Sequence, residues 1–145
     1  MARALEYNQR TIDRFHETKG RDVPPWGPNL LLLTTKGEKT GEEVTTPTVR
    51  REEGDRYVIV ASKGGAPEHP QWYRNLQKNP EVTIEVPAEE GTEVLTARAT
   101  PIPEGPERDR LYDFMAEVWP AFYDYEKKTD RKIPIVILEP IQDIG

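Results

Sequence analysis

A short stretch of the chain brings together a hydroxyl, a cation, two glycines and an aromatic pair. It runs from Val60-Ala-Ser-Lys-Gly-Gly-Ala66 into Pro70-Gln-Trp-Tyr-Arg-Asn-Leu76. An apolar run ends at Ser62, the only serine of the chain, and Lys63 follows it. The two glycines behind them allow positive φ angles and a close approach of a ligand to the backbone. Consecutive N–H groups in such a turn can form a concavity that binds anions.

A helix expected to begin near Pro70 would add unpaired N–H groups and the positive end of its dipole. Together with the hydroxyl of Ser62 and the charge of Lys63, these donors suit a phosphate group or an electron-rich ring edge. A tight turn whose glycines only permit the geometry accounts for the same residues, so both interpretations stay open. No nucleophile-elbow pattern surrounds Ser62, and the sequence therefore does not predict a serine hydrolase.

The second candidate is Thr34-Thr-Lys-Gly-Glu-Lys-Thr-Gly41, whose Gly-Glu-Lys-Thr invites comparison with phosphate loops. A phosphate loop requires a Gly-Lys pair that follows another glycine by five positions, and this stretch has no such pair. Lys36 and Lys39 could still contact a phosphate as flexible point charges. The alternative is a hairpin loop with solvated lysines.

A third cluster, Trp119, Phe122, Tyr123 and Tyr125, flanks Pro120. Spacings of three and four residues place several of these side chains on one helical face. They could form the wall of an apolar substrate pocket, or they could pack in the core, which is the commoner fate of such a cluster.

The composition argues against several kinds of site and partner. Without cysteine, the chain forms no disulfide, thiolate nucleophile or cysteine-type metal site. His16 and His69 lie far apart, and neither belongs to a metal-ligand motif, so we expect no metal site. A net charge of -6 argues against nucleic-acid binding. No apolar run approaches the ~20 residues of a membrane helix, and the N-terminus lacks the apolar core of a signal peptide. We therefore expect a cytoplasmic protein without an integral membrane segment.

The hydrophobic pattern predicts six strands and three helices. We expect the strands at 30–35, 44–51, 56–61, 81–86, 92–102 and 133–138, and the helices at 7–19, 70–79 and 107–119. The apolar run at 30–35 is typical of a strand that is buried on both faces. Pro47 indicates an edge position or a bulge, and Pro120 should kink or restart the last helix.

Hairpin-like spacing of these segments indicates a mostly antiparallel sheet, and short strands that bury two faces favour closure into a small barrel. The predicted class is mainly β with flanking helices (α+β). A single domain, 1–145, would consist of an N-terminal helix and loop (1–29), barrel strands (30–102), a C-terminal helical segment (103–129) and a last strand (133–140).

Several of these stretches resemble the deazaflavin-dependent nitroreductase family. The matching segments are 32–41, 60–66, 70–76, 79–82, 119–125 and 131–140, in order along roughly residues 5–140. The resemblance implies a six-stranded, mostly antiparallel split β-barrel related to flavin-binding oxidases. It also implies coenzyme F-420, an 8-hydroxy-5-deazaflavin with a phosphate and an oligoglutamate tail. In this family the reduced cofactor donates a hydride to a small acceptor such as an enone, a quinone or a nitroaromatic compound.

Carried over residue by residue, the resemblance implies a cofactor site and an acceptor pocket. The implied cofactor-binding residues are Lys39, Thr46, Pro47, Thr48, Val49, Ser62, Lys63, Gly64, Gly65, Gln71, Trp72 and Asn75. Trp119, Phe122 and Tyr125 should shape the acceptor pocket, and Ser62, Tyr125 and Trp119 are the catalytic candidates. We expect Ser62 and Tyr125 to donate hydrogen bonds to the acceptor as negative charge develops on it.

Two alternatives stay open at this point. One is an FMN-dependent relative on the same barrel, and the other is a non-catalytic carrier of a deazaflavin, haem or fatty-acid-like ligand. A small-molecule electron acceptor is the expected partner, and the sequence fits a monomer or a homodimer equally well.

Overall fold

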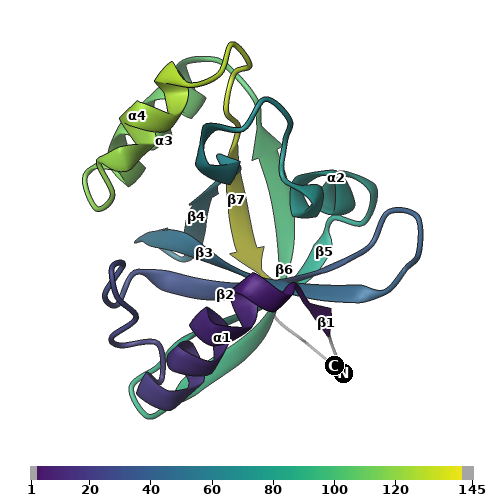
Figure 1. The fold of residues 1–145 in the computed structure, drawn as a ribbon, viewed down its shortest axis with the longest axis vertical. Helices are drawn as coiled ribbons and strands as arrows, with labels where there is room; N and C mark the ends of the chain where they lie inside the picture. Colours follow the sequence, from purple (N-terminus) through teal and green to yellow (C-terminus); the bar gives the residue numbers. More distant parts are fainter. Residues whose placement is uncertain (1–2, 142–145) are drawn as a thin grey trace.

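A computed structural model describes residues 3–141 and shows a barrel of six antiparallel strands with a short seventh strand beside it (Figure 1). The strands are β1 (Arg3–Ala4), β2 (Leu30–Lys36), β3 (Glu43–Glu53), β4 (Arg56–Val60), β5 (Glu81–Pro87), β6 (Thr92–Ile102) and β7 (Ile135–Pro140). The helices are α1 (Glu6–Thr18), the 3-10 turn η1 (Lys63–Gly65), α2 (Gln71–Lys78), α3 (Pro106–Ala116) and α4 (Ala121–Lys127).

The barrel closes in the order β3-β2-β5-β6-β7-β4, and β4 returns to pair with β3. All pairings within this ring are antiparallel. The predicted class, mainly β with flanking helices around a six-stranded, mostly antiparallel split barrel, is confirmed. Within residues 3–141, no helix is both long and apolar enough to span a membrane.

The structure differs from the predicted elements at both ends of the chain. The two-residue strand β1 runs parallel to β3, and so short a strand leaves no periodicity to read. The segment predicted to be helical at 103–129 divides into α3 and α4, as the restart at Pro120 suggested. The last strand begins at Ile135, two residues later than predicted, behind Pro134, which lacks a backbone N–H.

Three strands bury both of their faces, because each lies between two apolar clusters. In β2, Leu31 and Leu33 belong to a cluster with α2, whereas Leu30 and Leu32 belong to a second cluster with α1, α3 and α4. The same division holds along β4 and β7. The continuous apolar run at the start of β2 therefore has the predicted cause, since alternate side chains point into different clusters.

The long strand β3 changes partners along its length. One side pairs with β2 throughout residues 43–49, whereas the other side pairs with β1 at 44–45 and with β4 at 50–53. The stretch 46–49 therefore has an open edge on that side among the described residues. Pro47 lies in this stretch, where a residue without an N–H costs no ladder hydrogen bond. The predicted edge position of Pro47 is thus explained by the split in the barrel.

The C-terminal helices are fixed to each other and to the segment before β7 by buried polar contacts. Arg108 of α3 is 3% exposed, and its guanidinium donates from Nε to the carbonyl of Ile133 at 2.9 Å and from one terminal nitrogen to Glu126 at 3.0 Å. The hydroxyl of Tyr112 donates to the carbonyl of Phe122 in α4 at 2.5 Å. Burial raises the pKa of Tyr112 above its ordinary value of 10.0, so this phenol keeps its proton.

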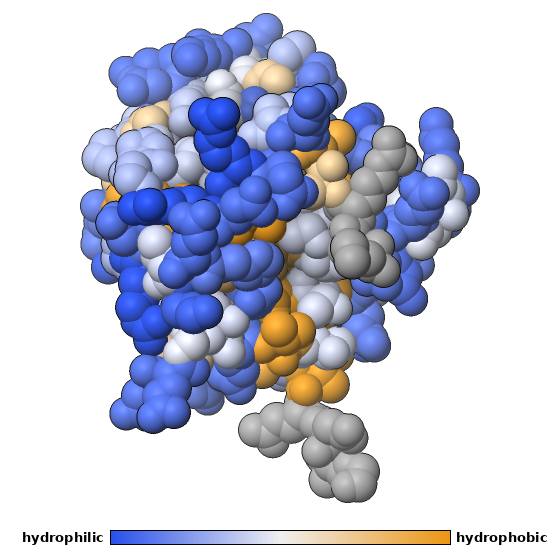
Figure 2. Space-filling view, turned by 60° about the horizontal axis from the view of Figure 1, so that its bottom comes forward, coloured by the Kyte–Doolittle hydropathy of each residue, from blue (hydrophilic) through white to orange (hydrophobic). Residues whose placement is uncertain are grey.

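The outer surface is strongly polar, as the 32% of charged residues requires. The face in Figure 2 is mostly hydrophilic, and apolar colour shows only in small areas between the polar side chains. Exposed ion pairs contribute to this surface; Arg110, for example, contacts Glu53 at 2.8 Å and Glu107 at 2.8 Å. Hydrogen bonds from Arg110 and from Arg56 lower the pKa of Glu53 to about 2.

We expect Tyr112→Phe to lower the free energy of unfolding by about 1 kcal/mol, since a buried hydrogen bond between α3 and α4 is lost. Tyr123→Phe is the matched control, because its hydroxyl contacts Asp113 at the surface, and it should change stability by less than ~0.5 kcal/mol. Urea unfolding of both variants measures the difference. Equal stability of the two variants would contradict this role of Tyr112.

Candidate functional site

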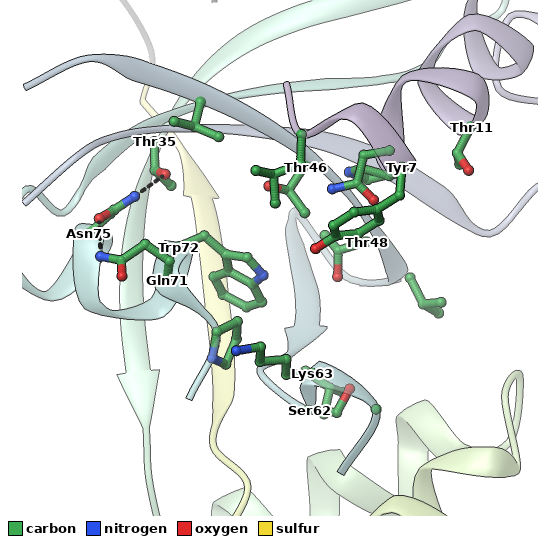
Figure 3. A pocket seen from close by; sticks show the side chains of 18 of the residues that line it. Tyr7, Thr11, Thr35, Thr46, Thr48, Ser62, Lys63, Gln71, Trp72 and Asn75 are labelled. Carbon is green, nitrogen blue, oxygen red and sulfur yellow. Dashed lines mark hydrogen bonds between the residues drawn. The ribbon is translucent and has the colours of Figure 1, made fainter. Parts of the chain in front are cut away.

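A pocket of about 880 Å³ lies along the open edge of β3. Figure 3 shows the side chains of Thr46, Thr48, Ser62, Lys63 and Trp72 around a common space. Its walls come from β3, the hairpin loop (residues 37–42), the serine loop (residues 61–69), α2, the start of α1 and the segment from Trp119 into α4. Segments distant in the sequence therefore meet at the place where the barrel is split.

Nearly all the residues predicted for the site line this one pocket. These are Lys39, Thr46, Pro47, Thr48, Val49, Ser62, Lys63, Gly64, Gln71, Trp72, Asn75, Trp119, Phe122 and Tyr125. Gly65 is the one predicted residue outside the lining. Their roles toward a ligand stay predictions, because position alone assigns no chemistry.

The open edge of β3 presents backbone polar groups as well as side chains to this pocket. Arg50 donates its backbone N–H to Asn29, on the side of β3 that faces β2. Because successive residues of a strand direct their backbone polar groups to opposite sides, the C=O of Pro47 and both the N–H and C=O of Val49 face the open side. A flat polar ring could pair with such an edge as a further strand would.

The serine loop turns sharply directly after β4. Ser62 has right-handed helical angles (φ -83°, ψ -37°), and Lys63 follows with φ 46°. This succession is the backbone geometry that makes an anion-binding concavity. The positive φ angle of Gly64, 62°, continues the turn, and an added Cβ there would meet no atom within 4 Å. Gly64 and Gly65 adopt the positive φ angles that the sequence allowed, whereas the positive φ angle of Lys63 was not expected.

Gly65 serves a different purpose from its neighbour. Its φ angle is 86°, and a Cβ at this position would lie 2.8 Å from the carbonyl oxygen of Tyr125 and 3.0 Å from the Cβ of Lys128. Any side chain would therefore push the serine loop away from α4. Gly65 permits close packing between the serine loop and the aromatic segment, and it does not face the pocket.

The first turn of α2 closes the pocket beside the serine loop. Pro70 precedes the helix in an extended conformation (φ -63°, ψ 151°), with no side chain that caps the first N–H groups. The helix thus retains unpaired donors at its start, next to Gln71 and Trp72. Figure 3 shows the indole of Trp72 pointing toward the middle of the pocket, although the residue is only 8% exposed.

Asn75 fastens the hairpin loop to α2. Its Nδ2 donates to the hydroxyl of Thr35 at 3.0 Å, and its Oδ1 accepts from the backbone N–H of Glu38 at 3.0 Å and from Gln71 at 3.0 Å (Figure 3). Asn75 is 2% exposed, so these contacts satisfy an amide that has no access to water. The hairpin loop, which carries Lys39, is positioned by this amide.

The aromatic wall (Trp119, Phe122 and Tyr125) forms the opposite side of the pocket. The indole N–H of Trp119 donates to the hydroxyl of Tyr125 at 3.3 Å, and the rings of Phe122 and Tyr125 meet edge to face at 5.9 Å. Phe122 is 3% exposed and belongs to the core, so it both packs in the core and forms part of the pocket wall. The ring of Trp26 lies 6.2 Å from that of Trp119 and extends the wall.

Charges of both signs reach the pocket. Lys39 is exposed at its mouth, whereas the ammonium of Lys63 contacts the carboxylate of Glu68 at 2.7 Å. This contact lowers the pKa of Glu68, which stays ionised at neutral pH. The carboxylate of Glu38 accepts from Gln71 at 3.1 Å and also lines the pocket. Lys39 therefore supplies a more available cation than Lys63 does.

One wall of the pocket was missed by the sequence analysis. Tyr7, Asn8 and Thr11 of α1 line the pocket, and Tyr7 is 76% exposed. The buried face of α1 is marked by Ile12 and Phe15, and the spacing of Tyr7 and Thr11, four residues apart, marks a second face. Tyr7, an aromatic residue outside the buried face of α1, was the one feature of the sequence that could have indicated this wall.

The fold and the pocket define a split-barrel protein whose open strand edge, serine loop and aromatic wall surround one space. The sequence matches the F420H2-dependent quinone reductase family over residues 6–140. An F420H2-dependent quinone reductase of Mycobacterium tuberculosis strain H37Rv is 41% identical over 121 residues, which cover 82% of this chain and 78% of the relative. The chain belongs to the F420H2-dependent quinone reductase family, and so to a family of oxidoreductases.

Two solved structures share this fold at high identity. One, described as an F420-H2 dependent reductase, is 40% identical, has a TM-score of 0.67 and covers 77% of this chain and 94% of its own. The other, described as a domain-swapped dimer, is 36% identical, has a TM-score of 0.69 and covers 92% of this chain and 98% of its own. The predicted family resemblance is therefore confirmed.

We expect Asn75→Ala to lower the free energy of unfolding by about 2 kcal/mol, because the N–H of Glu38 loses a buried acceptor and Thr35 loses a donor. Amides of the hairpin loop should also exchange faster with solvent. Gln77→Ala is the control on the exposed side of the same helix and should have an effect below ~0.5 kcal/mol. Chemical unfolding and hydrogen exchange measure both effects, and unchanged loop exchange in Asn75→Ala would refute the role of Asn75.

Proposed function

We propose that this protein transfers a hydride from reduced coenzyme F-420 to quinones. The observation that carries the proposal is the position of the pocket in a chain of this family. An open strand edge, an anion-binding turn and an aromatic wall line one space of about 880 Å³. When bound, the reduced deazaflavin supplies the hydride, and the protein supplies the orientation and the surroundings.

The residues present fit such a cofactor on chemical grounds. The turn at Ser62 and Lys63 and the start of α2 offer backbone donors for an anionic or electron-rich group. Pro47 and Val49 would meet the polar edge of the ring through their backbone groups, with Thr46 and Thr48 beside them. Gln71, Trp72 and Asn75 would complete the groove, and Lys39 would contact the anionic tail. Gly65 would act indirectly, through the packing of the serine loop.

The acceptor would lie against the aromatic wall. The hydroxyl of Tyr125 accepts the indole N–H of Trp119, and among the described residues no protein atom accepts the hydroxyl hydrogen of Tyr125. That hydrogen is available to a quinone oxygen on which negative charge develops, and Ser62 offers a second hydroxyl. Trp119 would then orient Tyr125, and Phe122 would exclude water from the reacting atoms.

Enones and nitroaromatic compounds are further candidate acceptors. Like quinones, they are flat and conjugated, and each develops negative charge on oxygen when a hydride adds. The same two hydroxyls could stabilise that charge. The family description names quinones alone, so the two other classes rest on chemical analogy.

The two alternatives have less support. Neither the family description nor the relatives described above name FMN, so an FMN-dependent enzyme is not supported. A non-catalytic carrier would need no hydrogen-bond donor beside a bound acceptor, so the hydroxyl hydrogen of Tyr125, which no described residue accepts, favours an enzyme. Cofactor preference separates the first alternative from the proposal, and turnover separates the second.

A fluorescence titration with oxidised F-420, and with FMN in parallel, tests the cofactor. We expect F-420 to bind in the micromolar range or tighter and FMN to bind more weakly. Lys39→Ala should weaken F-420 binding about twofold to threefold, since an exposed charge pair contributes roughly 0.5 kcal/mol. Lys78→Ala, a change to an exposed lysine outside the pocket, is the control. FMN binding without F-420 binding would overturn the proposal.

A second prediction concerns turnover. Tyr125→Phe should lower kcat for quinone reduction about 10-fold to 100-fold and leave F-420 affinity unchanged, because the lost hydroxyl acts on the acceptor. Tyr123→Phe, whose hydroxyl contacts Asp113 outside the pocket, is the matched control and should retain full kcat. Steady-state oxidation of reduced F-420 by a soluble quinone measures both. Full activity of Tyr125→Phe would exclude this role.

A further inference from the structure

Arg131 holds the serine loop from behind the pocket. This residue lies between α4 and β7 and does not line the pocket. Its guanidinium donates to the carbonyls of Ala66 at 2.9 Å, Ser62 at 2.8 Å and Ala61 at 3.3 Å. A fourth hydrogen bond, at 3.0 Å, goes to Nδ1 of His69. All four acceptors belong to residues 61–69, so one side chain spans the whole serine loop.

A lysine could not replace this arrangement. Arginine presents five N–H donors in a fixed plane, whereas lysine presents a single flexible ammonium. Burial lowers the pKa of Arg131 below its ordinary value of 12.5, but this group stays charged at any physiological pH. The four acceptors thus receive a permanent cation with fixed geometry.

The same segment connects the serine loop to the aromatic wall. Gly65 packs against the backbone of α4 at Tyr125, and Arg131 follows the end of α4 by only a few residues. The Gly65 contact therefore joins the loop proposed to hold the cofactor ring to the helix proposed to hold the acceptor, and Arg131 joins the same loop to the segment that follows this helix. Hydride transfer is sensitive to small changes in the distance between reactants, so this connection matters to the reaction.

We propose that Arg131 is a positioning residue, which fixes the serine loop relative to α4 and so sets the distance between cofactor and acceptor. The proposal rests on the proposed function, because it concerns the same site. Arg131 acts through Ser62, Lys63 and Gly64 and touches neither reactant.

His69 makes this positioning sensitive to acid. Its Nδ1 accepts from Arg131 only while that nitrogen carries no proton. Burial, together with the charges of Arg131 and Arg74, lowers the pKa of His69 below its ordinary value of 6.5. The ring of Tyr73 lies 4.8 Å away, and Glu68, the adjacent carboxylate, contacts Lys63. The contact is therefore complete above pH 6.5 and is lost as the pH falls through the folded-state pKa.

The test uses Arg131→Lys, Arg131→Met and His69→Gln, with Lys132→Met as the control. Lys132 is the exposed neighbour, and it forms a surface ion pair with Asp109 at 3.4 Å. Hydrogen exchange of the ligand-free protein reports the amides of Gly65 and Ala66, which bond within the loop. Titration with F-420 at several pH values reports affinity, steady-state kinetics reports kcat, and thermal unfolding reports the fold.

We expect both Arg131 variants to speed exchange at these two amides about tenfold and to lower kcat about tenfold or more. His69→Gln keeps an acceptor that does not titrate, so its F-420 affinity should stay constant where that of the unaltered protein weakens in acid. In Arg131→Met, the F-420 affinity should likewise no longer weaken as the pH falls. Lys132→Met should match the unaltered protein throughout.

Unchanged exchange and unchanged kcat in Arg131→Met would overturn the proposal. Unchanged exchange and kcat in Arg131→Lys would overturn the claim that the planar guanidinium is required. A lower melting temperature of Arg131→Met, with kcat and pH profile retained, would show that Arg131 only stabilises the fold. If the unaltered protein binds no F-420, the proposed function fails, and the exchange rates still decide whether Arg131 fixes the loop.

Discussion

The partner change along β3 is the constraint on which the site depends. A strand that leaves β1 after residue 45 and joins β4 only at residue 50 has an open edge between these points. Unpaired backbone groups at a sheet edge must meet water, protein or ligand. The chain surrounds this edge with the hairpin loop, the serine loop and the aromatic wall, so a pocket forms there. Pro47 fits the edge because it has no N–H to leave unpaired.

Each wall of the pocket is held by contacts outside it. Asn75 fastens the hairpin loop, Arg131 fastens the serine loop, and Tyr112 fastens α4. These side chains are buried or half-buried and bond mainly to backbone groups, so they fix the course of the chain more than they bind ligands. Under the proposed function, such preorganisation would let weak surface charges suffice for cofactor binding, because the cost of ordering the loops is met during folding.

The fold was largely predictable from the sequence, because its apolar runs have strand lengths and its turns carry glycine and proline. Ser62, Lys63 and Gly64 were predictable as site residues because they stand together directly after a strand. Trp72 and Asn75 were implied only by the family resemblance. Tyr7 and Thr11 were not predicted as pocket residues, since no pattern in the sequence of α1 indicates that its second face lies near β3. Arg131 also escaped, because its acceptors are backbone carbonyls some 65–70 positions earlier, and such contacts leave no pattern in composition or spacing. The family resemblance implies that Gly65 contacts the cofactor, whereas in the structure Gly65 packs against α4 and does not line the pocket.

Hydride transfer within a single turnover tests the proposed reaction most directly. Protein in excess over reduced F-420 would be mixed rapidly with a soluble quinone, and the return of deazaflavin absorbance would be followed. If the pocket holds both reactants, absorbance should return in one fast enzyme-bound phase, which slows when the transferred hydrogen is replaced by deuterium. A rate no faster than that in buffer, or one insensitive to deuterium in both the unaltered protein and Tyr125→Phe, would contradict hydride transfer in this pocket.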